Sequence, residues 1–177
     1  DPYLVLATRN PIEQAGVYPL PEAQIDRFLI CIAMGYPTAE DEAHMLRTWR
    51  AKRKPPAPIL DAEAIKSLRD AVDEIHLAPE LEGYIVSLAN ASRNDVRVEL
   101  GASPRASLAL ARAARAWAYL DGRDHVLPED IRSILSSVWS HRLVLTPEAH
   151  MNGVDAARVI QDLVAQVEFK GPASRVQ

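Results

Sequence analysis

Apolar residues are patterned in two different ways along the chain, and the change falls near residue 37. Before it, two short runs are almost entirely apolar, Tyr3–Thr8 and Phe28–Ala33. Such runs are typical of strands buried on both faces of a parallel sheet. A short helix is predicted between them, over Glu22–Arg27, with Pro21 at its start. Residues 1–37 are therefore predicted to be α/β.

From residue 38 onward, polar caps and prolines mark a series of helix starts. A long Ala-rich helix is expected to end at Gly122, and three prolines near residue 56 indicate a stiff linker after the first helix. The predicted starts are Thr38, Asp61, Pro79, Ser103-Pro104, Pro128 and Asp155. The predicted fold class is mainly α: two parallel strands and a short helix over residues 1–37, followed by an all-α domain over residues 38–177.

Composition limits the classes of protein to consider. The 177 residues are 48% apolar and 25% charged, so the chain can bury a core. A net charge of -4 makes nucleic acid an improbable partner. The single cysteine, Cys31, gives no disulfide framework and fits a reducing cytoplasm. No signal peptide or membrane-spanning apolar run is visible, which predicts no membrane association. The start at Asp1 instead of methionine suggests that Asp1 is not the natural first residue.

Self-sufficient catalytic motifs are not found in the sequence. No histidine pair has the spacing of a metal site, and no nucleophile elbow occurs, so no metal ligands are predicted. A phosphate-binding loop needs Gly-Lys after an earlier glycine, and none of the seven glycines precedes a lysine. An apolar strand ending in paired acids for Mg²⁺ is also missing. Taken alone, this chain is expected not to hydrolyse ATP.

Three positions could still act on a phosphate. Asn10 follows the first predicted strand, where ligands of open α/β sheets bind, and could orient a water; Asn10-Pro11 is also a common turn signal. Arg27 stands between the short helix and the second predicted strand and could project as a fixed cation, or pair with Asp26 on the surface. Arg105 lies in the first turn of a predicted helix, beside free amides that attract anions, or it extends into solvent.

Together, in this order and spacing, these segments resemble the MoxR family of AAA+ ATPases. Leu4–Pro37, which contains Asp26-Arg27-Phe28, resembles the segment that follows the family's second acidic motif. Gly101–Ile131 resembles the family's lid, and the run from His141 to Leu145 fits as well. The resemblance implies that residues 1–37 are the C-terminal part of an AAA+ nucleotide-binding core. It also implies that residues 38–177 are the helical lid domain.

The resemblance assigns roles by position. Asn10 matches the sensor-1 asparagine, Arg27 the arginine finger that acts on a neighbouring subunit's ATP, and Arg105 the sensor-2 arginine, acting within its own subunit or on a neighbour. Arg9 departs from the family's usual glutamine and adds a charge beside the sensor. ATP and Mg²⁺ are the implied cofactors of the parent protein, with no Mg²⁺ ligand in this chain. The implied assembly is a homo-oligomeric ring, commonly a hexamer. The implied partners have von Willebrand factor A domains, and the implied task is client maturation such as metal insertion.

Two other functions remain open at this point. Residues 38–177 could be a non-catalytic helical module that binds a protein partner. A DNA motor would share the sensors, but the net charge disfavours it.

The resemblance also places partner strands upstream of Tyr3. Without them the two predicted strands would expose apolar faces, and we expect burial against another copy or partial disorder there.

Overall fold

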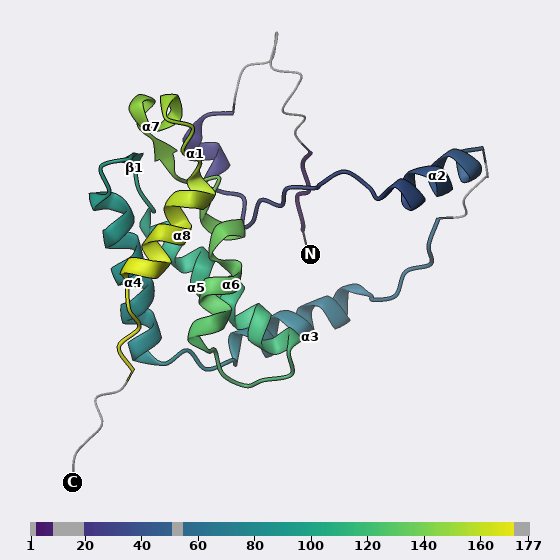
Figure 1. The fold of residues 1–177 in the computed structure, drawn as a ribbon. Coiled ribbons are helices and arrows are strands. Elements are labelled where there is room, and N and C mark those ends of the chain that lie inside the picture. The colour runs from purple at the N-terminus through teal and green to yellow at the C-terminus, as the bar shows by residue number, and fades with distance from the viewer. Residues whose placement is uncertain (1–2, 9–19, 51–54, 172–177) are drawn as a thin grey trace.

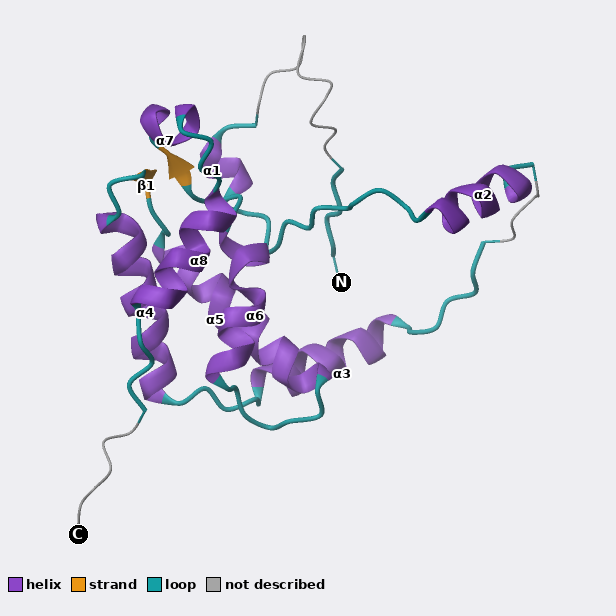
Figure 2. Cartoon of the chain, in the orientation of Figure 1, coloured by secondary structure: helices purple, strands orange, loops and turns teal. Residues whose placement is uncertain are grey.

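The structure is a computed structural model that describes residues 3–8, 20–50 and 55–171. Figure 1 shows a bundle formed by helices α4–α8. Helix α3 connects this bundle to α2, which is set apart on an extended arm. Figure 2 shows how little strand accompanies these helices. The elements in chain order are α1 (Glu22–Ile25), α2 (Ala39–Thr48), α3 (Ala62–Asp73), α4 (Pro79–Asn94), β1 (Val98–Leu100), α5 (Pro104–Leu120), α6 (Pro128–Trp139), β2 (Val144–Leu145), α7 (Pro147–Met151) and α8 (Ala156–Gln166). The predicted mainly helical class is confirmed.

Helix starts follow local side-chain caps. The side chains of Thr38, Asp61, Ser103 and Asp155 each accept a backbone N–H from three residues further on, which satisfies one of the unpaired amides of the first turn. Gly122 ends α5 with a φ of +73°, a conformation that costs other residues energy. These starts were all predicted. The short helix α7, capped by Thr146, was not.

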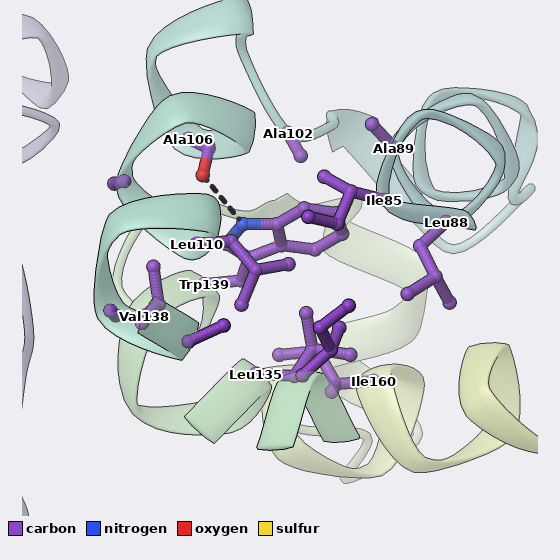
Figure 3. Close-up of a cluster of buried hydrophobic side chains, with 14 of the residues drawn as sticks. Ile85, Leu88, Ala89, Ala102, Ala106, Leu110, Leu135, Val138, Trp139 and Ile160 are labelled. Carbon is purple, nitrogen blue, oxygen red and sulfur yellow. Dashed lines mark hydrogen bonds between the residues drawn. The ribbon is translucent and has the colours of Figure 1, made fainter. Parts of the chain in front are cut away.

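The core lies between α4, α5, α6 and α8, with Trp139 at its centre. The Trp139 side chain is fully buried, and its indole N–H donates to the Ala106 carbonyl at 3.0 Å (Figure 3). Helix α5 packs against α6 and buries small residues at spacings of three and four, which are Ala106, Ala109 and Ala113. The bundle therefore has its own hydrophobic core.

The two predicted parallel strands are not formed. Tyr3–Thr8 and Phe28–Ala33 carry no strand in the structure, and apart from the half-buried Phe28 their apolar side chains are exposed, with Leu6 at 86% and Ile32 at 69%. A buried parallel strand needs hydrogen-bonded neighbours on both edges, and the described residues supply none. The prediction was wrong because apolar patterning marks a strand's preference but not its partners.

The strands that do form within the described residues were not predicted. β1 and β2 pair antiparallel inside the helical part, with Val98 opposite Leu145 and Leu100 opposite Val144. They are too short for an alternating pattern to identify them. Their pairing places the chain after α6 beside the chain before α5, so the start of α5 and the residues following α6 lie in one region.

Candidate functional site

Arg27 lies two residues beyond the end of the short helix α1, after the capping residue Asp26, and is exposed. Among the described residues, its side chain has no ion pair or hydrogen bond. The surface pair with Asp26 that the sequence allowed is not formed, because the Asp26 carboxylate binds Arg142 instead, at 3.0 Å from Nε to Oδ1. Arg27 is therefore an exposed cation next to an anchored residue.

Asp26 connects three parts of the chain. Its carboxylate also receives the Ser103 hydroxyl, at 3.1 and 3.3 Å from the two oxygens. That same hydroxyl accepts the Ala106 N–H and so caps α5. The Arg105 Nε lies 4.0 Å from the second Asp26 oxygen, which is a weak contact for a side chain that is 59% exposed. The structure thus brings the residue before Arg27 to the same place as the start of α5 and Arg105.

Arg142 is the buried centre of this network, with only 2% of its side chain exposed. A guanidinium has five N–H donors, and here each one is used. They bind the Asp26 carboxylate and the carbonyls of Asp26, Phe28, Leu29 and Val138. Burial lowers the pKa of Arg142, and the neighbouring Asp26 carboxylate opposes that shift. An arginine nevertheless stays charged, so the Asp26 carboxylate compensates a buried cation.

Two further contacts hold the same segment to the end of α6. The His141 Nε2–H donates to the Phe28 carbonyl at 3.1 Å, and the Cys31 N–H donates to the Ser137 carbonyl at 2.8 Å. Burial lowers the pKa of His141, and its hydrogen bond to Phe28 partly opposes this. Its Nδ1 is buried with no hydrogen-bond partner among the described residues. A protonated His141 would place an unpaired charge there, so the neutral ring is favoured.

Arg105 occupies the first turn of α5, as predicted, after the Ser103 cap and Pro104. A cation there opposes the helix dipole. The Asp26 carboxylate near the Arg105 side chain offsets part of this unfavourable interaction with the dipole. Because the side chain remains largely exposed, it can contact a ligand outside the bundle.

Asn10, the third predicted site residue, lies outside the described residues, as does Arg9. The two arginines are therefore placed in the structure and Asn10 is not. In the parts of the chain that the structure describes, no cluster of three or more His, Cys, Asp or Glu residues could hold a metal ion. None of the described helices combines the length and apolar character needed to cross a membrane.

Arg142 was not predicted as a site residue. The signal available was an arginine inside an apolar run, His141 to Leu145, where a cation needs a partner. Its partner Asp26 lies 116 residues away in sequence, and no local pattern identifies it.

Family models match two separate stretches of the chain. Residues 1–30 match the model of the ATPase family associated with various cellular activities (AAA), and residues 90–163 match the AAA lid domain. Chaperone MoxR1 of Mycobacterium tuberculosis is 41% identical over 178 residues, which cover 94% of this chain and 47% of that protein. Protein MoxR of Methylorubrum extorquens is 34% identical and covers 96% and 54%, respectively. The chain belongs to the MoxR family of AAA+ ATPases.

Two further proteins match nearly the whole chain. The uncharacterized protein YeaC of Bacillus subtilis is 37% identical over 180 residues, covering all of this chain and 56% of that protein. A crystal structure from Cytophaga hutchinsonii, of a protein provisionally described as an ATPase, superposes with a TM-score of 0.88 at 34% identity. That superposition covers 97% of this chain and 55% of that one. The chain thus spans about half the length of the curated relatives it matches.

Proposed function

We propose that this chain is the sensor and lid part of an ATP-hydrolysing, chaperone-like MoxR protein. In this proposal residues 1–37 belong to the nucleotide-binding core, and residues 38–177 form the lid. The proposal is supported by the matched relatives, which are about twice as long, and by the AAA and lid models at the two ends of the chain. Mg²⁺ would be bound by residues outside this chain, and so would most of the ATP molecule.

Arg27 carries the mechanism that we propose. An exposed cation beside an anchored backbone can extend from one subunit to the terminal phosphate of ATP held by the next. When ATP is bound there, an arginine would stabilise the charge on the transferred phosphoryl group in the transition state. Such an arginine raises the rate by about 10³ to 10⁵. Because the residue acts across an interface, the proposal includes a homo-oligomeric ring, with six subunits as the family's common number. The single observation that supports this role best is that Asp26 binds Arg142 and leaves Arg27 exposed.

The other two site residues would also act on the terminal phosphate of ATP, Asn10 on the ATP of its own subunit and Arg105 on that of its own subunit or a neighbour. Asn10 would orient the attacking water through its amide, and Arg105 would contact the terminal phosphate from the lid. ATP is the cofactor that the family implies, and exposed arginines at positions 27 and 105 suit an anionic ligand of this kind. Proteins with von Willebrand factor A domains, and clients that need maturation such as metal insertion, are the proposed partners.

ATP hydrolysis by full-length subunits tests the proposal. Arg27→Ala should lower the rate at saturating ATP by about 10³-fold or more while nucleotide binding remains. Arg69→Ala is a matched control, because Arg69 is also exposed and has no ion pair among the described residues. Mixing Arg27→Ala subunits with Asn10→Ala subunits should restore part of the activity, since each supplies what the other lacks. Normal ATP hydrolysis by the Arg27→Ala protein would refute the assignment of Arg27 as the arginine finger.

A non-catalytic binding module is the second candidate function. Helix α2 favours it: the helix has no buried residue, and Leu46 and Trp49 are more than two-thirds exposed. Exposed apolar residues in such a group are typical of contact surfaces. This function would take precedence if the Arg27, Asn10 and Arg105 variants all hydrolysed ATP normally while substitution of Trp49 abolished binding of a partner.

A further inference from the structure

We propose that Arg142 is a positioning residue for the arginine finger, fixing the segment that carries Arg27 to the end of lid helix α6 in the same subunit. The inference rests on the proposed function, because it concerns how Arg27 is presented to the neighbouring subunit. Arg142 itself would contact neither ATP nor the reacting atoms.

The geometry of the guanidinium supports this role. Four of its five hydrogen bonds go to residues 26–29, and the fifth goes to the Val138 carbonyl in α6. The acceptors stand on both sides of Arg27: the carboxylate and carbonyl of Asp26 before it, and the carbonyls of Phe28 and Leu29 after it. The backbone of Arg27 is thereby fixed at both ends to one buried, planar group.

Two contacts independent of Arg142 hold the same segment against the same helix end. His141 binds the Phe28 carbonyl, and the Cys31 amide binds the Ser137 carbonyl. Residues 26–31, the segment that carries Arg27, therefore form one packed unit with the C-terminal end of α6, although residues 28–33 form no strand. A shift of α6 would carry Arg27 with it.

The lid side of this unit also includes the sensor-2 region. Ser103, which caps α5, and Arg105 both lie at the Asp26 carboxylate. A lid movement that accompanies nucleotide binding at Arg105 would thus reach Arg27 through Asp26 and Arg142. The state of one subunit's lid would set the finger position offered to the next subunit.

Only an arginine satisfies all of these acceptors. A lysine would keep the charge but has three donors on one nitrogen, which cannot reach carbonyls spread around a planar fork. Arg142→Lys is therefore expected to behave as a loss of positioning. If only charge compensation of Asp26 mattered, Arg142→Lys would retain function.

The test separates the subunit that donates the finger from the one that receives it. Donor subunits carry Asn10→Ala, which disables their own site, and receiver subunits carry Arg27→Ala, so hydrolysis depends on the donor's finger. Arg142→Lys or Arg142→Met is then placed in the donor or in the receiver. A misplacement of about 1 Å can lower a rate by about 10²-fold. We expect a loss of about tenfold to 100-fold with the donor variants and a much smaller loss with the receiver variants.

Arg123→Met in the donor controls for general weakening of the lid. Arg123 also pairs with a buried carboxylate, that of Asp130, but at the opposite end of α6. Hydrogen exchange on the 177-residue chain gives a readout independent of ATP. Exchange of the Cys31 amide should accelerate about tenfold or more in Arg142→Met, while amides within α5 keep their protection.

The outcomes are distinguishable. A donor-specific loss together with faster Cys31 exchange supports the positioning role. Equal losses in donor and receiver, full activity of Arg142→Lys, a comparable loss with Arg123→Met, or unchanged Cys31 exchange would each overturn it. A reference donor–receiver pair without any hydrolysis would instead refute the finger assignment of the proposed function, and the exchange result would then show whether Arg142 still anchors the segment.

Discussion

Substitutions at the adjacent residues Asp26 and Arg27 should have very different effects on stability. Asp26→Ala removes the carboxylate 3.0 Å from a guanidinium whose side chain is only 2% exposed. Arg27→Ala removes an exposed side chain with no ion pair among the described residues. If the Arg142–Asp26 contact is the structural interaction, Asp26→Ala lowers the midpoint of thermal unfolding and Arg27→Ala does not.

The magnitude follows from the burial of the two partners. Breaking a buried ion pair from one side destabilises a protein by about 3–5 kcal/mol, because the remaining charge stays buried. Asp26 is 26% exposed, and the four carbonyl contacts of Arg142 remain in the variant, so we expect about 2 kcal/mol. For a chain of this size, about 2 kcal/mol lowers the thermal midpoint by about 4–8 °C. Arg27→Ala should shift it by less than about 2 °C.

Thermal unfolding followed by far-ultraviolet circular dichroism measures the difference. Asp70→Ala is the control for Asp26→Ala, since it removes an exposed carboxylate that has no ion pair in the described part of the chain. Equal shifts of the thermal midpoint for Asp26→Ala and Arg27→Ala would refute the reasoning. They would instead support a surface ion pair between Asp26 and Arg27.

Three further predictions concern the bundle. Trp139→Phe removes the indole N–H donor to the Ala106 carbonyl and leaves a cavity where the larger ring lay, so urea unfolding should show a loss of about 1–3 kcal/mol, and unchanged stability would mean that neither the bond nor the extra ring contributes. Because the pKa of His141 is lowered in the folded state, its stability contribution is complete above the unfolded value of 6.5 and is lost as the pH falls from there through the folded-state pKa; His141→Gln should flatten that part of a stability–pH curve, and an unaltered curve would contradict the assigned neutral ring. Gly101→Ala would place a Cβ 2.7 Å from the Arg93 backbone and should lower the thermal midpoint more than Gly122→Ala, where only the φ of +73° opposes alanine; the opposite order would show that the Arg93 backbone yields easily.

Helix starts could be predicted because the interactions that define them are local. Ser103 and Asp155 each bind an amide three residues away, so the sequence contains the donor and acceptor side by side. The residue types alone indicated these caps. The same holds for Gly122, whose left-handed conformation ends α5. Local chemistry therefore predicted most of the bundle's boundaries.

Strands and long-range charge pairs could not be predicted in this way. The apolar run Tyr3–Thr8 has the composition of a buried strand, but a strand forms only where another strand supplies hydrogen bonds. Likewise, the sequence showed Asp26 beside Arg27 and gave no measure of the distance to Arg142. All three site residues, Asn10, Arg27 and Arg105, were proposed from their positions in the sequence, whereas Arg142 became apparent only with its partner.

Desolvation explains why Asp26 binds the distant arginine and not the adjacent one. An exposed Arg27 gains little from a carboxylate, because water solvates its charge well. A buried Arg142 without a carboxylate would be an uncompensated charge among apolar residues, which is far more unfavourable. The carboxylate therefore lowers the free energy more by binding Arg142, and Arg27 keeps its side chain unpaired as a consequence. Within the proposed mechanism, anchoring the backbone and exposing the cation are then two results of one interaction, and removal of the Asp26 carboxylate should impair the anchoring while the Arg27 side chain stays exposed.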